Sequence, residues 1–234
     1  MEEKKARLEK QIKEITNFKS SIKIYFILSI FIISSFIFIQ LFVIKGKLLQ
    51  FFDEERSVIM KEDEKSFLFS EIERKTNKKI KKINKLYQET IDGGDIVIFH
   101  KKCDSISNTL VLIKSEGNAR FGGFTPIPWK SVEGYEDKYD SRNETFVFSL
   151  DEKQSYHLIS TSKSAVCRYL DFGPCFGSGD IIIKGNPIEE EGLRTYLKSS
   201  SFDFKSAQYP LSERSDDTYI KIREYEIFQV IFND

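Results

Sequence analysis

The chain has 234 residues, of which 40% are hydrophobic and 31% are charged. It is too apolar for a disordered protein, and its composition excludes the collagen-like and disulfide-framework classes. Its 36 basic and 36 acidic side chains leave no net positive charge that would favour nucleic acid as a partner. The charge is nevertheless divided, because residues 1–92 carry 19 basic and 14 acidic side chains whereas residues 93–234 carry 17 and 22.

An uncharged run of 21 residues, 24–44, lies between Lys23 and Lys45. At 1.5 Å of rise per residue a helix of this length measures roughly 31 Å, close to the hydrocarbon thickness of a bilayer. The run is longer than the apolar core of a signal peptide, and no small-residue cleavage site follows it. The sequence therefore predicts one transmembrane helix at residues 24–44, preceded by a short amphipathic segment at residues 1–23, with the lipid bilayer as a partner.

Two signals for membrane sidedness disagree. Seven basic residues before the run and five after it favour a cytosolic amino terminus, which would expose the sequon at Asn143 to glycosylation. Three cysteines, Cys103, Cys167 and Cys175, are few and odd in number, which is more typical of reduced thiols in the cytosol. We take as the expectation a single-pass membrane protein whose globular part faces the cytosol.

Residues 45–92 are predicted to form a helical or coiled-coil stalk, because they contain one glycine and no proline. Within them, helical spacings of three and four predict a helix over residues 71–90. The spacings join Ile72, Thr76, Ile80, Ile83 and Tyr87. Seven of the twelve positions at 74–85 are basic, which suits either a helix on an anionic membrane or acidic partner, or a solvated spacer; the spacer is favoured. Self-association through residues 47–90 would produce a homo-oligomer.

Short apolar runs separated by turn residues follow Gly93. Four of them have the length and composition of β-strands. They are residues 109–115, 145–150, 180–184 and 223–232. Together they predict an α+β, mainly β domain at residues 93–234, built as an antiparallel two-sheet β-sandwich with edge helices. Residues 195–198 and the segment before Cys103 are the candidate helices.

Several strings of this half come in a recognisable order: FHKKCD (99–104), NTLVLIKS (108–115), FGGFTPIPW (121–129), TFVFSL (145–150), FGSGDIII (176–183) and EYEIFQV (224–230). Residues 90–233 thereby resemble the TLDc domain, the module of the oxidation resistance proteins. They depart from the family's pattern at Ser105 and at residues 187–194. The resemblance implies a two-sheet antiparallel β-sandwich in which the segment of Phe99 and His100 is helical. It also implies a role in protection against oxidants and, for some members, binding to the vacuolar proton-pumping ATPase.

The motif residues are interpreted as structural. Gly122 and Gly123, like Gly177 and Gly179, are expected to permit turns or bulges that side chains would block. Trp129 is expected to fill the core or a sheet edge. The string GPCFGSGD lacks the lysine and hydroxyl residue of a phosphate-binding loop. The remaining members of the structural set are Cys103, Asp104, Phe148 and Asp180.

Catalysis is poorly supported, because the chain has only two histidines, His100 and His157, and no recognisable catalytic motif. No cysteine pair has the spacing of a zinc site, so we expect no catalytic residue, no metal and no cofactor. A redox or peroxide-consuming protein acting through Cys103 is the alternative. The neighbouring Asp104 argues against it, because a carboxylate raises the pKa of a thiol.

The sequence thus predicts a membrane-anchored, non-catalytic interaction module. Glu224 and Glu226, in the last expected strand, are the candidates for partner contact, with plain solvent exposure as the simpler interpretation. The expected protein partner is the vacuolar proton ATPase. A self-associating membrane scaffold is the other alternative.

Overall fold

The computed structural model describes the following residues: Lys13, Phe18, Lys19, 33–43, 56–184, 194–197 (backbone only), 201–204, Leu211 and 219–233. The chain divides into two compact units, residues 1–54 and 55–234. In the first unit residues 33–43 are helical and carry exposed apolar side chains. Among the described residues, no helix combines the length and the apolar character that a membrane span requires. The other residues of the predicted span 24–44 lie outside the described part.

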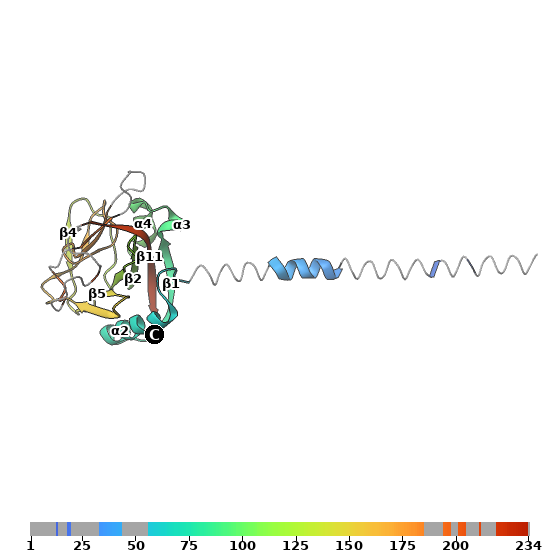
Figure 1. Ribbon diagram of the computed structural model, residues 1–234, viewed down its shortest axis with the longest axis horizontal. Coiled ribbons are helices and arrows are strands. Elements are labelled where there is room, and N and C mark those ends of the chain that lie inside the picture. The colour runs from blue at the N-terminus through green and yellow to red at the C-terminus, as the bar shows by residue number, and fades with distance from the viewer. Residues whose placement is uncertain are drawn as a thin grey trace, which may run out of the picture. The chain divides into compact units, whose positions relative to one another are not determined.

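The second unit contains three helices and eleven strands within the described residues (Figure 1). The helices are α2 (Glu62–Thr76), α3 (Glu89–Asp92) and α4 (Ile96–Cys103). The first strands are β1 (Ile80–Gln88), β2 (Thr109–Ser115), β3 (Arg120–Thr125), β4 (Glu136–Tyr139), β5 (Phe146–Ser149) and β6 (Gln154–His157). The remaining strands are β7 (Ser164–Arg168), β8 (Cys175–Phe176), β9 (Ile181–Lys184), β10 (Arg194–Leu197) and β11 (Tyr219–Phe232).

Every strand pair is antiparallel, in the order β4-β7-β8-β9-β10-β11-β2-β3-β5-β6, with β1 added on β11. β11 is the centre of this arrangement because it pairs with β1, β2 and β10. The prediction of a mainly β, α+β domain with antiparallel strands is confirmed. The strand order runs continuously through β11, so this pairing does not establish the predicted two-sheet sandwich.

Two apolar clusters cover the two faces of the central strands. Val111 and Ile113 of β2 belong to one cluster, and Leu110 and Leu112 to the other. Because successive strand residues point to opposite faces, β2 is buried on both sides. Helix α4 packs into the first cluster and α2 into the second. Figure 1 shows β1 running from the α2 end of the unit to the end that carries α3 and α4.

The helix predicted over residues 71–90 is wrong in its second half. Helix α2 ends just before Asn77, which adopts a left-handed φ of 53°, and the chain continues as β1. Two register shifts interrupt the pairing of β1 with β11. Because such shifts break the two-residue alternation of a strand, the apolar residues acquire the spacing of a helix. From residue 56 onward the predicted stalk is therefore part of the globular unit, whereas residues 45–55 lie outside the described part.

The two candidate helices near the motifs have different outcomes. Residues 96–103 form α4, as the resemblance implied, although the run of isoleucine and valine favours a strand. The helix begins there because the Asp95 carboxylate accepts a hydrogen bond from the Val97 N–H, at 2.8 Å, and caps the first turn. Residues 195–198 were expected to be helical, but Thr195 to Leu197 belong to β10, where they pair with β9 and β11.

Candidate functional site

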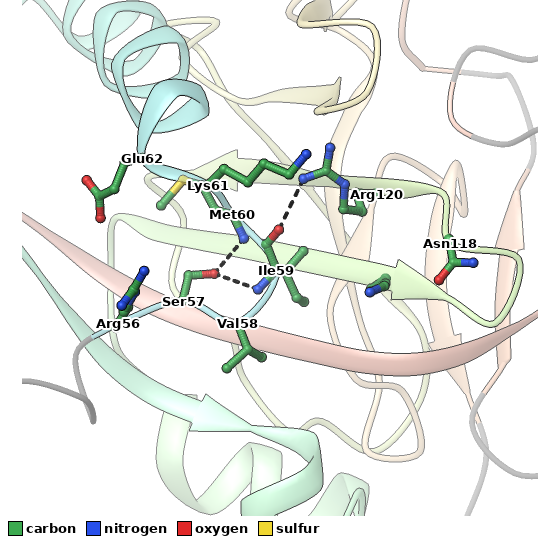
Figure 2. Close-up of a pocket in the computed structure, with 10 residues that line it drawn as sticks. Arg56, Ser57, Val58, Ile59, Met60, Lys61, Glu62, Asn118 and Arg120 are labelled. Carbon is green, nitrogen blue, oxygen red and sulfur yellow. Dashed lines mark hydrogen bonds between the residues drawn. The ribbon is translucent and has the colours of Figure 1, made fainter. Parts of the chain in front are cut away.

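A cleft of about 610 Å³ lies in the second unit (Figure 2). One wall is the segment 56–62, which leads into α2, and the other is the β2–β3 hairpin with Lys114, Asn118 and Arg120. The hairpin is fixed by the antiparallel pairing of β2 with β3. The segment 56–62 has no strand partner, so its position depends on side chains that hold its backbone.

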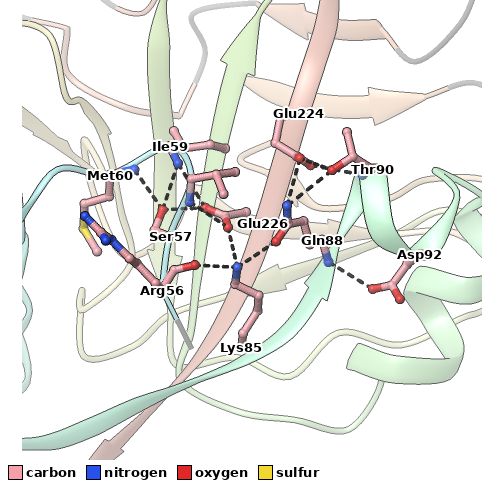
Figure 3. Close-up of polar contacts among 11 residues, drawn as sticks. Arg56, Ser57, Ile59, Met60, Lys85, Gln88, Thr90, Asp92, Glu224 and Glu226 are labelled. Atoms are coloured by element: carbon pink, nitrogen blue, oxygen red, sulfur yellow. Dashed lines mark hydrogen bonds and ion pairs between the residues drawn. The ribbon is translucent and has the colours of Figure 1, made fainter. Parts of the chain in front are cut away.

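Glu226 of β11 holds that segment in place (Figure 3). Its carboxylate accepts hydrogen bonds from the backbone N–H of Val58, at 3.1 Å, and from the Ser57 hydroxyl. Lys85 of β1 forms an ion pair with the same carboxylate at 2.8 Å and donates to the Arg56 carbonyl at 2.6 Å. We call Glu226, Lys85 and Ser57 the Glu226 clasp. The clasp joins the start of the unit to its central strand.

Glu224, two residues earlier on β11, is used in the same way (Figure 3). It accepts hydrogen bonds from the Gln88 amide at 3.2 Å and from the Thr90 backbone N–H at 3.3 Å. The structure therefore does not support Glu224 and Glu226 as partner-contact residues, since both are buried and Glu226 has no exposed surface. Charged residues in a strand usually face solvent, but here segments more than 130 positions away in the chain cover them.

Arg120 of β3 lies on the hairpin side of the cleft. Its guanidinium bonds Glu64 of α2 at 2.7 Å and Asp151 at 2.7 Å, and one of its nitrogens reaches the Ile59 carbonyl at 3.3 Å. Glu64 also accepts from the Lys61 backbone N–H at 2.9 Å, which caps the start of α2. Arg120 thus links the hairpin, α2 and the segment 56–62.

The Cys-Asp motif at the end of α4 is structural. The Asp104 carboxylate is 2.8 Å from His100 Nδ1 and accepts the Ser131 N–H at 2.7 Å, so it ties the helix to the loop after β3. Trp129 is buried in the first cluster, and its indole N–H donates to the Thr109 hydroxyl at 2.9 Å. In these contacts the Asp104 carboxylate and the Trp129 indole N–H bond other groups of the protein itself.

The two glycine pairs have different reasons for being glycine. Gly122 and Gly123 lie inside β3 and not in a turn or bulge, contrary to the expectation. A Cβ atom on Gly123 would stand 2.6 Å from the Phe176 ring, so glycine is needed for close packing. Gly177 and Gly179 do occupy a turn, with φ of 66° and 103°.

The last two motif residues are buried. Asp180 accepts hydrogen bonds from the backbone N–H groups of Ser201 at 2.9 Å and Phe202 at 3.4 Å. Phe148 lies in the second apolar cluster. Asp180 and Phe148 therefore stabilise the interior of the domain.

Two of the three cysteines differ from the expectation of reduced thiols. Cys167 of β7 and Cys175 of β8 form a disulfide, with Cα atoms 5.2 Å apart. The pairing of β7 with β8 at Val166 and Phe176 brings them to that distance. Cys103 is free and has no exposed surface. Burial, and to a lesser degree the charge of Asp104, raises the pKa of its thiol far above the ordinary value, so the thiolate that redox chemistry requires is suppressed.

The histidines do not form a catalytic arrangement. His157 Nε2 is 3.2 Å from Glu71 and 3.4 Å from the Ser155 hydroxyl. A catalytic triad needs the serine and the carboxylate on different ring nitrogens, whereas here both meet Nε2. Among the described residues, no group of three or more His, Cys, Asp or Glu side chains could hold a metal ion.

A comparison with known protein families matches most of the second unit. The family model of the TLDc domain matches residues 54–231. No curated protein matches the chain. The matched region begins where the second unit begins, near residue 55, and so includes α2, β1 and the segment 56–62. The sequence placed the start of this domain at residue 93, because the family's recognisable strings are all in the later part.

Proposed function

Because the chain belongs to the TLDc family, we propose that it is a membrane-anchored, non-catalytic interaction module that acts in oxidative-stress protection by binding the vacuolar proton ATPase. The observation that carries the proposal is the family match over residues 54–231. The internal use of the motif's polar groups supports it, because Asp104, Asp180 and the Trp129 indole all bond the protein itself. The module would act through its surface.

The buried glutamates of β11 leave the contact surface to other residues. Two of the most exposed apolar side chains of the second unit are Ile91 on α3, 72% exposed, and Val97 on α4, 69% exposed. They stand six positions apart in the chain, on either side of Gly93 and Gly94. Exposed apolar side chains that share a small region are candidates for protein contact. We propose this α3–α4 corner as the place to test.

The test is co-purification of the full chain from detergent-solubilised membranes, with quantitative identification of peptides. We expect subunits of the vacuolar proton ATPase with the wild type and their loss with the double substitution Ile91→Asp and Val97→Asp. Ile159→Asp is the matched control, because Ile159 is 58% exposed and belongs to neither helix. If no pump subunit exceeds the level found with a scrambled 24–44 segment, the proposed partner is wrong.

Anchoring rests on the uncharged run 24–44 and on the exposed apolar side chains of the helical residues 33–43. We expect the full chain to sediment with membranes and to resist extraction by alkaline carbonate. The substitutions Ile33→Asp and Phe36→Asp should release it to the supernatant, because a charge at the centre of a span costs about 3 kcal/mol. Ile33→Leu with Phe36→Leu is the matched control. A wild type that stays soluble after lysis without detergent contradicts the anchor.

We place the globular unit on the cytosolic side, where the pump's soluble part could be reached. On that side glutathione would hold Cys167 and Cys175 reduced, whereas an oxidising compartment would retain their disulfide. Protease digestion of sealed membranes, glycosidase treatment for Asn143 and thiol labelling without prior reduction give three independent readouts. A protected, glycosylated unit with an intact disulfide would exclude the cytosolic placement and the pump contact with it.

The two alternatives from the sequence are not proposed further. The redox alternative requires a reactive Cys103, and that thiol is buried and has a raised pKa. Loss of any peroxide consumption on Cys103→Ser would restore that alternative. The scaffold alternative required a free stalk at residues 47–90, but α2 and β1 are packed into the globular unit.

A further inference from the structure

We propose that the cleft between the segment 56–62 and the β2–β3 hairpin binds a ligand that carries two or more phosphate groups. The proposal concerns a small anionic ligand and is independent of the pump contact and of the membrane anchor. It rests on the cleft's volume, on the charges that line it and on how few of those charges form an ion pair with a described residue.

The charge of the cleft differs from that of the unit around it. Four of its ten lining residues are cationic and one, Glu62, is acidic. The unit at residues 55–234 as a whole has 27 basic and 30 acidic side chains. A concentration of positive charge on an otherwise acidic unit marks this cleft as the place where an anion is attracted.

Of the four cations, Arg120 is the one that forms ion pairs with described residues. Arg120 is neutralised by Glu64 and Asp151. Within the described part of the chain, the side chains of Arg56 and Lys114 form no ion pair or hydrogen bond. The charge of Lys61 interacts with Asp63, whose carboxylate is itself paired with Lys153 at 3.1 Å. Positive charges in one cleft repel each other, and a multivalent anion would reduce that repulsion.

The strand register places two of the four cations side by side. Lys114 of β2 stands opposite Arg120 of β3 in the antiparallel pair, so the two side chains share one face of the sheet. Like charges directly opposite each other destabilise a sheet. Glu64 and Asp151 already neutralise Arg120, and Glu224 of β11 stands opposite Lys114 on its other side. An anion held between the hairpin and the segment 56–62 would add to these contacts and would bind at the Lys114 side of the pair.

The positions of the donors suit a ligand larger than one phosphate. Figure 2 shows the Lys61 side chain extending toward Arg120, with Arg56 at the other end of the segment 56–62. Asn118 accepts a hydrogen bond from Arg223 on its side-chain oxygen at 3.4 Å, so its amide N–H groups are available to a ligand. A volume of about 610 Å³ is that of an ordinary small-molecule site and exceeds what a single phosphate fills.

Two sources could supply this chemistry, the headgroup of a phosphorylated inositol lipid or a soluble polyphosphorylated molecule. Arg56 follows residue 44 by twelve positions, so an extended chain keeps it within roughly 40 Å of the end of the uncharged run. Both sources present clustered phosphates to the same cations. The test is designed to separate them.

The experiment titrates inositol 1,4,5-trisphosphate into the full chain in neutral detergent, followed by calorimetry. We expect one site per chain and a loss of affinity of about tenfold or more in the double variant Lys61→Gln and Lys114→Gln, because each substitution removes one cation from the cleft. The matched control is Lys81→Gln with Lys82→Gln, two exposed lysines of β1 that do not line the cleft. The control should change the affinity less than about twofold.

Three results would overturn the proposal: no heat of binding by the wild type at millimolar trisphosphate, equal losses in the cleft and control variants, or a cleft variant that binds as well as the wild type. Unchanged thermal unfolding of both variants shows that any loss is local.

A second arm assigns the source by placing the full chain in lipid nanodiscs. If the natural ligand is a lipid headgroup, discs that contain phosphatidylinositol bisphosphate will block added trisphosphate, whereas discs of equal charge made with phosphatidylserine will not. If the ligand is soluble, trisphosphate will bind equally in both. Equal blocking by both lipids would show a diffuse charge effect and contradict the site.

Discussion

Glu226 connects three separate parts of the domain through one carboxylate. It bonds the backbone of the segment 56–62, the Ser57 hydroxyl and the Lys85 ammonium, and it has no exposed surface. A buried charge is tolerated only when it is paired and hydrogen-bonded, and each of these contacts meets part of that need. The carboxylate therefore has a structural role, although its place in a strand of alternating polar and apolar residues predicts solvent exposure.

Replacing Glu226 by glutamine should lower the free energy of unfolding by roughly 2–4 kcal/mol, because Lys85 would lose its counterion in the interior. Urea unfolding of the full chain in detergent measures this, with the fluorescence of the single, buried Trp129 as the probe. Glu133→Gln, at an exposed position, is the control and should change the stability by less than about 0.5 kcal/mol. A Glu226→Gln variant as stable as the control would show that the clasp contributes nothing.

Three buried groups predict that the domain loses stability in alkali. Burial raises the pKa values of Cys103, Tyr87 and Tyr225 above their ordinary values of 9.0 for the thiol and 10.0 for the tyrosines. The folded state keeps these protons, whereas the unfolded chain releases them above pH 9. Stability is therefore full below pH 9 and falls as the pH rises beyond it, by about 2 kcal/mol near pH 10.

Urea unfolding of the wild type and of Cys103→Ala across this range checks the prediction. The variant should lose most of the dependence between pH 8.5 and pH 10, since of the three groups Cys103 has the lowest ordinary pKa. An alkaline loss of the same size in both proteins would assign it to other groups.

At the scale of elements, the change from helix to strand at Asn77 decides how the amino-terminal part of the domain is used. Asn77 has a φ of 53°, which ends α2 and directs the chain back along β11 as β1. Asparagine tolerates this left-handed conformation better than residues with larger aliphatic side chains.

Asn77→Ala should cost about 1 kcal/mol of stability, because alanine pays a steric penalty in this conformation. Asn77→Gly should stay within about 0.5 kcal/mol of the wild type, since glycine adopts a positive φ freely. Thermal or urea unfolding of the three proteins gives the comparison. If alanine is tolerated as well as glycine, the helix does not end through this conformation.

The same elements show what a sequence can and cannot predict. The run 109–115 agrees with β2 to the residue, because turn residues bound it. β1 was missed because its two register shifts imitate helical spacing. Residues 195–198 carry no strong pattern, and their strand depends on pairing with β9 and β11. Local patterns were sufficient only where no distant partner decided the outcome.

The candidate site was less predictable, for a related reason. Glu226 contacts Ser57 across 169 positions, and Arg120 contacts Glu64 across 56. No periodicity marks either pair in the sequence. The basic residues Lys61 and Lys114 likewise become neighbours of one cleft only through the fold. The glycines of β3 were expected in a turn or bulge, but they lie within the strand, where a Cβ atom would meet the Val111 backbone at Gly122 and the Phe176 ring at Gly123.

For the whole molecule, the domain must begin near residue 55. A fragment that begins at residue 93 lacks α2 and β1, so the second apolar cluster loses Leu68, Ile72 and Ile83 and becomes exposed. We expect residues 55–234 to unfold cooperatively and residues 93–234 to lack a cooperative transition, because residues 226–232 of β11 would lose their partner on one edge. Calorimetry and backbone amide spectra distinguish the two. A cooperative transition of the shorter fragment would contradict this boundary.

The Glu226 clasp also determines how the domain responds to mechanical force. A pull on the chain ahead of Arg56 is transmitted to Lys85 through the Arg56 carbonyl, and to the Glu226 carboxylate through the Ser57 hydroxyl and the Val58 N–H, so several bonds share the load. Only after these bonds rupture can α2 and then β1 be drawn away from β11. The domain therefore resists a pull on its amino-terminal side first at the Glu226 clasp and then at the bonds of Arg120 to Ile59 and Glu64.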